Sequence, residues 1–376
     1  MDIFVFTNPT AETLMEQGEY IDKITSKTWI ERFRDAGEFT LVAPVSSGIK
    51  EKLPLGSFIS HTDSTEIMIV ENHEINEDST SSTEPDITVT GRSLETFLEN
   101  RIVGANIFLP FSGTVGDKTF DADWTWNQAV ALISDGILSS SLVDSNFVVP
   151  YIEVISYTPG ISGGTNAARS FPIGTTYAAL TNLLAIDNLG IRTVRPVSGS
   201  DGNTKLVVHN GIDKTSDIVF SFNSGQVLTA DYLWSNKTFK NSALVYGKWV
   251  IVSVNPSAVG YDRKMMLVDA SDLDNALTEV PTGDALSYLE VAMTLRGTEA
   301  LNSQTNVEIS KVEISKDGTR YRNMDGTFFE YRKDFNLGDF VTVQGDYHTT
   351  ATMQVTEYVE IEDNTGESGY PTLIIT

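Results

Sequence analysis

Short runs in which apolar and polar residues alternate, separated by turn residues, constrain the fold of this chain more than any other feature. The clearest run is WIERFRDAGEFTLVAP at residues 29–44. Successive side chains of a strand point to opposite faces, so Trp29 and Phe33 share one face before the turn, and Phe39 and Leu41 share one face after it. The run therefore predicts a β-hairpin whose aromatic face is buried.

Strands of this kind fill both ends of the chain. Residues 1–95 contain short strands and turns at the spacing of a barrel or sandwich, and the last part of the chain is equally rich in strands. Apolar residues at helical spacing predict helices at 91–103, 121–138, 174–190 and 284–302. We therefore predict an α+β fold that is mainly β.

One short similarity connects the two strand-rich ends. The tetrapeptide Leu-Gly-x-Phe occurs at residues 55–58 and again at 337–340, and an alternating strand follows each copy. A single tetrapeptide is weak evidence for a repeat, but it indicates that the two ends are similar small barrels.

The length of the chain indicates more than one domain. A chain of 376 residues exceeds the size at which a single hydrophobic core stops growing. We predict two small β-barrel domains that flank a mixed α/β insert domain. The first barrel comprises residues 1–95, the middle domain 96–235, and the second barrel, which carries a helical insertion, 236–376.

Composition excludes several kinds of site. The chain has no cysteine, which excludes disulfides, thiolate metal sites and cysteine nucleophiles. Its four histidines are scattered and form no zinc-binding motif, so we expect no metal and no cofactor. The formal net charge of −25 disfavours specific binding to nucleic acid. No apolar run reaches the about 18 residues that a membrane span requires.

One segment matches a catalytic pattern. The sequence GISGG at 160–164 fits G-x-S-x-G and would make Ser162 the nucleophile of a hydrolase, with His209 downstream. The motif requires a strand before it and a helix after it, yet Pro159 precedes the first glycine and Pro172 limits the length of a following helix. A flexible Gly/Ser loop is the alternative. We favour the loop and predict no catalytic residue.

Two further groups of residues leave alternatives open. The acidic stretch 269–279 resembles a calcium loop in its acidity alone, since it lacks the central glycine and the alternate spacing of ligands, and a solvated loop before a helix is the alternative. Trp124 and Trp126 suit stacking on a sugar, but at the start of a helix we favour a place in the core for one of them. Together with Trp234 they are the candidates for glycan binding.

Several segments, taken in chain order, resemble siphophage tail hub proteins. They are WIERFRDAGEFTLVAP, LPLGSFIS, EIMIVENHEI, ITVTGRSLETFLENRIV, VVHNGIDKTSDIVFSFNSG, NSALVYG and DFNLGDFVTV. No single segment is diagnostic, but their order is fairly specific and they extend over nearly the whole chain. The chain is therefore similar to a baseplate hub or tail-tip protein, like the trimeric hub of contractile-tailed phages.

The resemblance implies a structural virion protein rather than an enzyme. It implies a homotrimeric ring in which each chain carries two barrel tube domains, so that three chains match the six-fold tail tube. The implied neighbours are the distal tail protein ring, the tape-measure protein, and tail fibre or spike (receptor-binding) proteins. Phage DNA would pass transiently, and an acidic bore would not hold its phosphates. The implied location is the phage tail tip or baseplate, after assembly in the host cytoplasm.

This function gives the first hairpin a role. We predict subunit contacts through its charged residues, namely Arg32, Arg34, Asp35 and Glu38. We predict a barrel core that contains Trp29, Phe33, Phe39, Leu41, Phe58 and Phe340. The alternative functions are a tail-associated hydrolase of the cell wall and a glycan-binding adhesion module.

Overall fold

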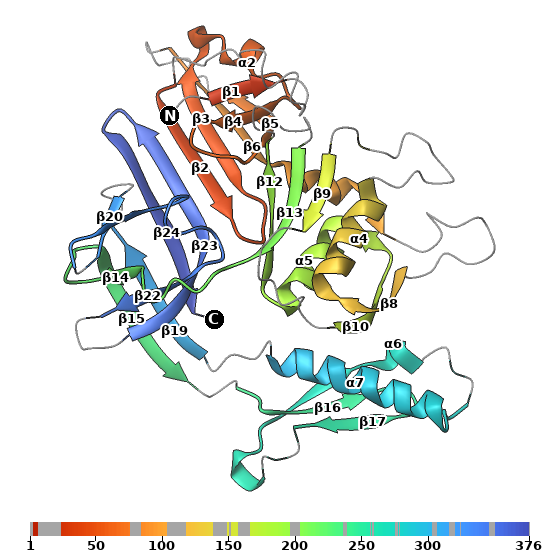
Figure 1. Cartoon of the computed structure of the whole chain (residues 1–376). Coiled ribbons are helices and arrows are strands. Elements are labelled where there is room, and N and C mark those ends of the chain that lie inside the picture. The colour runs from red at the N-terminus through yellow and green to blue at the C-terminus, as the bar shows by residue number, and fades with distance from the viewer. Residues whose placement is uncertain are drawn as a thin grey trace.

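The computed structural model describes most of the chain. The described residues are 3–6, 24–75, 84–103, 118–137, 149, 152–156, 166–195, 204–235, 239–255, 257, 259–274, 277, 279–302, 307–315, 320–323, 325–345 and 350–375. Figure 1 shows N-terminal strands, C-terminal strands beside them, a mixed middle group, and a separate group at the end of the molecule formed by part of the C-terminal third. The α+β, mainly β fold predicted from the sequence is confirmed.

The N-terminal group is a set of strands with two short helical turns at one end. Its elements are β1 (Ile3–Phe6), β2 (Ser26–Arg32), β3 (Glu38–Pro44), η1 (Val45–Ser47), α2 (Ile49–Lys52), β4 (Phe58–His61), β5 (Met68–Ile75) and β6 (Asp86–Ser93). The strands lie in the order β1-β4-β5-β6-β3-β2. Their buried apolar residues form the first core, which includes Trp29, Phe39 and Leu41.

The predicted hairpin is confirmed as β2 and β3. The strands pair antiparallel, with Trp29 opposite Phe39, and buried residues alternate along both strands. The position of Gly37, just after the turn, requires a glycine, because a Cβ there would lie 2.5 Å from the backbone oxygen of Ile30. Local alternation and a close backbone approach together fix this hairpin.

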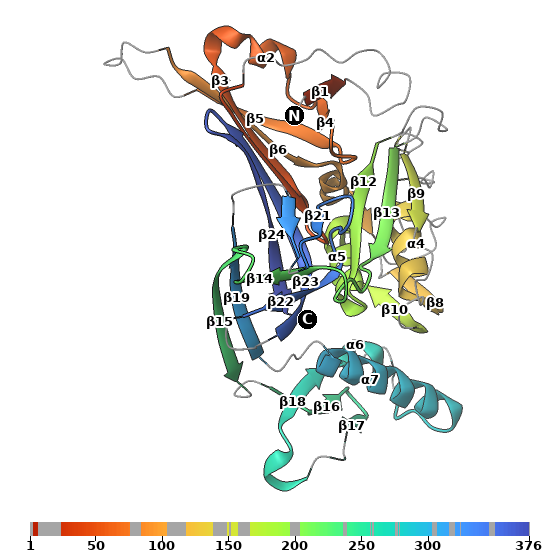
Figure 2. The same cartoon turned by 60° about the vertical axis from the view of Figure 1, so that its left-hand side comes forward.

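Part of the C-terminal group continues the same sheet. The elements of the group are β14 (Val219–Ser221), β15 (Val227–Ser235), β19 (Val307–Ile314), β20 (Arg320–Arg322), β21 (Phe328–Glu330), β22 (Phe340–Gln344), β23 (Thr350–Asp363) and β24 (Gly366–Ile375). Of these, β14, β22, β23 and β24 continue the sheet, while β15 with β19 and β20 with β21 form two-stranded sheets. β2 pairs antiparallel with β23, so strands from both ends of the chain belong to one ten-stranded sheet (Figure 2). A second core lies under these strands and contains the rings of Phe220, Phe329 and Phe335.

Two meanders within this sheet share their local structure. We call β4, β5 and β6 the first meander and β22, β23 and β24 the second. Each begins with the shared tetrapeptide, in which Gly56 and Gly338 have φ of 81° and 90°. The Gly56 N–H donates to the Val70 oxygen at 2.8 Å, and the Gly338 N–H donates to the Val355 oxygen at 2.7 Å. Both turns thus require glycine and connect to the next strand in the same way.

The strand registers of the two meanders also agree. Ile59 lies opposite Met68 in the first meander, and Val341 lies opposite Met353 in the second. The register then shifts two residues further along in both, immediately after Val70 and after Val355. A common turn, a common register and a common bulge indicate an internal repeat that the tetrapeptide alone only suggested.

The middle group packs helices against a small sheet. Its elements are η2 (Leu94–Asn100), β7 (Ile102–Val103), β8 (Lys118–Trp124), α4 (Thr125–Ile137), β9 (Ile152–Ser156), β10 (Asn166–Phe171), β11 (Gly174–Thr175), α5 (Thr176–Ile186), β12 (Leu189–Val194) and β13 (Thr204–Asn210). The Thr175 hydroxyl caps α5 by accepting the Ala178 N–H at 3.3 Å. Leu180, Leu183 and Leu184 of α5 are buried in the middle core.

The fourth group, which we call the insertion, lies between β15 and β19. Its elements are β16 (Ser242–Tyr246), β17 (Ile251–Val254), η4 (Gly260–Asp262), β18 (Met265–Asp269), α6 (Ser271–Asp274) and α7 (Asp284–Asn302). α7 packs on one face of the sheet β17-β16-β18. A Cβ at Gly297 of α7 would lie 2.6 Å from side-chain carbons of Val245 and Val254, so this close packing requires a glycine.

The predicted helices have different outcomes. Those at 121–138, 174–190 and 284–302 are confirmed as α4, α5 and α7. The prediction of one helix over 91–103 is wrong, because the backbone of 91–93 still pairs with strands on both sides and a short 3₁₀ helix follows. No helix in the described part of the chain is long and apolar enough to cross a membrane.

Candidate assembly surfaces

The four charged residues predicted as subunit contacts have different environments. Arg32 donates to Glu357 of β23 at 2.7 Å and to Glu38 at 2.8 Å, and Arg34 donates to the Leu189 oxygen at 3.1 Å. Asp35 and Glu38 are exposed. The two arginines thus join parts of one chain, while their contact with another subunit stays a prediction.

The six predicted core residues do not lie in one core. Trp29, Phe39 and Leu41 belong to the first core, whereas Phe33 packs in the second core. Phe58 is half-buried against the middle core, and Phe340 is half-buried in β22. Phe33 packs in the second core because it lies just past the end of β2, where its N–H donates to the Thr356 oxygen of β23. That these residues line a tube-like barrel stays a prediction.

A buried ionic network joins the two ends of the chain. Arg332, in the loop after β21, donates to Glu31 of β2 at 2.6 Å and to Glu360 of β23 at 2.8 Å. The Tyr331 hydroxyl donates to Glu31 at 2.7 Å, and His61 Nε2 lies 3.2 Å from Glu360. Each carboxylate therefore has a cationic partner inside the protein, which buried charges require.

The network fixes the charge of Glu31. Burial alone would raise the pKa of Glu31, but the charge and hydrogen bond of Arg332 outweigh burial and hold that pKa at about 2. Burial lowers the pKa of His61, and Glu360 opposes this shift. Arg332 also has a φ of 65°, a conformation that non-glycine residues rarely adopt. The loop is thus held in an unfavourable backbone conformation by its two carboxylate partners.

Two other buried glutamates lie near this network. Burial raises the pKa of Glu66 well above its ordinary value, and the charges of Glu31 and Glu95 add to the shift. Burial raises the pKa of Glu95 to about 7, although a hydrogen bond from the Ser93 hydroxyl opposes it. Glu66, between β4 and β5, and Glu95, in η2, are therefore acids that hold their protons in a range where surface acids have lost them.

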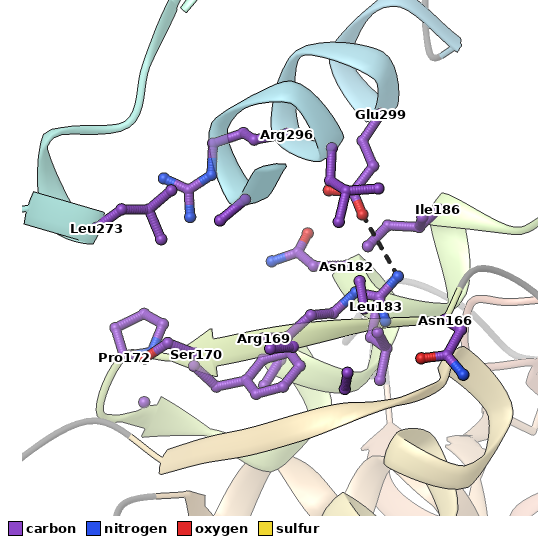
Figure 3. Close-up of a pocket in the computed structure, with 18 of the residues that line it drawn as sticks. Asn166, Arg169, Ser170, Pro172, Asn182, Leu183, Ile186, Leu273, Arg296 and Glu299 are labelled. Atoms are coloured by element: carbon purple, nitrogen blue, oxygen red, sulfur yellow. Dashed lines mark hydrogen bonds and ion pairs between the residues drawn. The ribbon is translucent and has the colours of Figure 1, made fainter. Parts of the chain in front are cut away.

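A cavity separates the insertion from the middle group. Its volume is about 770 Å³ and its walls come from α7, α6, β10 and α5. Figure 3 shows Arg169 and Glu299 facing each other across it, joined at 3.4 Å, with Leu273, Leu183 and Ile186 among the lining side chains. The walls are mainly apolar, so the insertion lies on the middle group without filling the space between them.

Of the two residues considered for catalysis, the structure describes only His209. Ser162 lies outside the described residues. His209 is buried in β13, with its ring 5.2 Å from that of Phe33, and burial lowers its pKa to about 3. A buried, neutral histidine beside an aromatic ring has the environment of a packing residue rather than of a solvent-accessible base.

The described candidates for metal and sugar binding have different environments. Within the described part of 269–279, Asp274 is buried and accepts the N–H groups of Lys248 and Trp249 at 2.8 Å, so it caps the turn between β16 and β17. No group of three acidic or histidine side chains suited to a metal occurs in the described residues. Trp124 is 43 % exposed and Trp126 is packed against the middle core, while the side chain of Trp234 lies outside the description.

Among the strand edges without a described partner, two belong to β15, which forms a separate two-stranded sheet with β19, and to β5 of the ten-stranded sheet. β15 pairs with β19 on one side, and no described strand pairs with its other side. β4 pairs with β5 at Met68 and Ile69, and past that point no described strand pairs with the same side of β5. An open edge presents backbone donors and acceptors to another strand.

Comparison with known proteins identifies the family. The model of the Siphovirus ReqiPepy6 Gp37-like protein family matches residues 5–373. The chain belongs to this family. No curated protein matches the sequence at a significant level.

Solved structures of phage tail proteins have the same fold as this family member. The 43 kDa tail protein of prophage MuSo2 from Shewanella oneidensis has a TM-score of 0.58 at 14% identity, with 100% of this chain and 98% of that chain covered. A tail protein from Neisseria meningitidis has a TM-score of 0.54 at 14% identity, with coverages of 99% and 95%. The prophage tail protein gp18 from Listeria monocytogenes has a TM-score of 0.50 at 12% identity, with coverages of 99% and 94%. The predicted resemblance to siphophage tail proteins is confirmed.

Sequence patterns missed most of the residues that join the groups. Arg332, Glu31 and Glu360 are distant in sequence and lie in no motif, and Asp274 belongs to a stretch whose acidity suggested solvation. The alternation of β2 placed Glu31 on the same face as Trp29, which was the one local indication that this carboxylate is buried.

Proposed function

We propose that this chain is a structural protein of the virion tail, a tail-tip or baseplate hub that forms a homotrimeric ring. The observation that carries the proposal is the internal repeat of the two meanders within one sheet. A chain with two like units, assembled as three copies, has six like positions around an axis. Such a ring can match a six-fold tube while retaining three-fold symmetry.

The proposed partners follow from this place in the tail. The distal tail protein ring and the end of the tape-measure protein would lie above the hub, and tail fibre or spike proteins below it. Phage DNA would pass through the bore without specific binding. The net charge of −25 supports passage, because a negative wall repels phosphates.

Light scattering and electron microscopy of the purified chain test the proposal. We expect a species with the mass of three chains, and images of a ring with three-fold symmetry and a central hole. A compact monomer over the accessible concentration range would contradict the ring. The same preparation should not shift a DNA fragment in a gel, whereas retention of DNA at physiological salt would contradict the proposed passage.

A parallel assay addresses enzymatic activity. The proposed structural role requires no turnover of isolated host cell wall, and wild-type protein and a Ser162→Ala variant should behave alike. Release of soluble wall fragments by the wild type, lost in the variant, would support a tail-associated hydrolase instead.

A further inference from the structure

One contact within the chain defines how a strand covers an open edge of a meander. The hairpin of β2 and β3 lies beside the first meander, because β3 pairs with β6. The other strand of this hairpin, β2, pairs antiparallel with Glu357–Glu362 of β23 in the second meander. This segment of β23 lies just past the bulge, on the side that β22 leaves uncovered. The second meander is thus completed by the hairpin of the first.

The matching segment of the first meander is β5 past its own bulge. The common turn, register and bulge align Val70 with Val355, so Asn72–Ile75 corresponds to the start of the segment that β2 covers. In the described sheet no strand pairs with that side of Asn72–Ile75. Among the described residues, the first meander therefore has an uncovered edge at the place where β2 covers the second meander.

The matching hairpin of the second meander is β15 and β19. β3 pairs with β6, and β19 lies beside β24, so β15 occupies the place that β2 occupies in the first hairpin. The side of β15 away from β19 is the second open edge. Figures 1 and 2 show β15 and β5 far apart, so β15 does not reach β5 within one chain.

We propose that β15 of one copy pairs antiparallel with Asn72–Ile75 of β5 in the next copy. This inference rests on the proposed ring and names its contact. The contact is heterologous, with one open edge donated and the other received, and such contacts close into a ring when the rotation permits. Each copy then repeats between chains the contact that β2 and β23 make within the chain.

The two contacts differ in chemistry. Ion pairs flank the contact within the chain, Lys27 with Glu362 and Arg32 with Glu357, each at 2.7 Å. Asn72 stands where the second meander has Glu357, and β15 carries no lysine or arginine. The contact between chains is therefore formed mainly by backbone hydrogen bonds, and its strength should depend little on salt.

Cysteine cross-linking tests this contact directly, because the chain has no cysteine. Asn72→Cys is combined in turn with Leu233→Cys, Trp234→Cys or Ser235→Cys, at the end of β15 that matches Arg32, which lies opposite Glu357 in β23; these positions sample both faces of β15. Neighbouring strands bring paired Cβ atoms close enough for a disulfide. Thr28→Cys with Ile361→Cys, opposite each other in β2 and β23, is the control within one chain. Asn72→Cys with Thr365→Cys, in the turn between β23 and β24, is the unpaired control.

The outcomes separate this inference from the ring itself. We expect at least one β5–β15 pair to shift the non-reduced mass on a denaturing gel from one chain to three, while the control within one chain remains a monomer and the unpaired control gives no trimer. Trimers in light scattering without any β5–β15 disulfide would overturn the contact and leave the ring standing. A protein that stays monomeric in every variant would overturn both.

Discussion

Single residues hold the two ends of this chain together. Arg332 contacts a carboxylate from the N-terminal group and another from the C-terminal group. The alternation of β2 indicates that Glu31 is buried, but no local pattern indicates its partner. Sequence reasoning predicts strands and helices from neighbours, but a network between positions 31, 332 and 360 depends on the finished fold. Its members were therefore not predictable as partners.

Removing Arg332 should destabilise the protein strongly. In Arg332→Met two buried carboxylates lose their cation, and breaking a buried pair in this way costs about 3–5 kcal/mol. We expect a matching loss in the free energy of unfolding measured by urea denaturation. Arg320→Met is the matched control, because Arg320 is 62 % exposed and its pair with Glu330 contributes about 0–1 kcal/mol. Equal losses in both variants would contradict the role given to the network.

The protonation of Glu95 should make stability fall as pH rises. Its pKa is raised to about 7 in the folded protein, so the folded state binds an extra proton between the ordinary pKa and that value. The associated stability is present in full at low pH and is lost as pH rises through about 7. In the Glu95→Gln variant the side chain stays neutral at every pH, so this loss of stability does not occur.

Thermal unfolding at pH 5 and pH 8 checks this prediction. Relative to wild type, Glu95→Gln should gain stability at the higher pH, although Glu66 keeps a dependence of the same sign in both proteins. Glu51→Gln, which changes an exposed acid, should follow the wild type at both values. Parallel profiles for Glu95→Gln and wild type would contradict the burial of a protonated acid at this position.

At the scale of elements, the sequence predicted what depends on local pattern. The β2–β3 hairpin, α4, α5 and α7 follow from alternation or helical spacing, and Thr175 is a capping residue of the expected type. The 91–103 segment failed because tertiary pairing with β3 and β5 extends a strand into residues with helical spacing. Long-range pairing overrode local preference there.

The two turn glycines offer a prediction on matched elements. Gly56 and Gly338 have similar positive φ, so alanine at either carries the same backbone penalty of about 1–2 kcal/mol. No atom lies within 4 Å of a Cβ at Gly56, but a Cβ at Gly338 would lie 2.3 Å from the ring of Phe33. Gly338→Ala should therefore lower the free energy of unfolding by clearly more than Gly56→Ala, measured by denaturant titration. Similar losses would show that Phe33 moves away freely.

At the scale of the whole molecule, the insertion is one continuous segment between two paired strands. Ser235 and Val307 are paired across β15 and β19, so the insertion leaves and re-enters at adjacent strand ends. The sequence predicted a helical insertion in the last third of the chain, but it did not predict that the insertion lies at the tip of a hairpin. The two strands of that hairpin, β15 and β19, are separated in sequence by the whole insertion, so no local pattern indicates their pairing. The predicted boundaries at 95 and 235 likewise stay predictions.

Removal of the insertion should leave the sheet folded. A variant in which Asn-Gly replaces 236–306 closes β15 and β19 as an ordinary two-residue hairpin. We expect cooperative unfolding and an unchanged number of copies in light scattering. Deleting the shorter segment Arg320–Glu330 is the control, because it removes the buried rings of Tyr321 and Phe329 and should abolish folding. Loss of cooperative unfolding in the variant that lacks 236–306 would show that the sheet needs the insertion in order to fold.

The presence of the insertion on one hairpin and its absence from the other has a consequence for any ring of these chains. The first hairpin ends in the short turn at 33–37, and the second carries a folded unit at the same place. Around a closed assembly, hairpins without the insertion alternate with hairpins that carry it. The repeat distance between identical hairpin tips is therefore twice the repeat distance between the meanders. A partner that binds the insertion would then have three sites on the ring, whereas a partner that binds the meanders would have six.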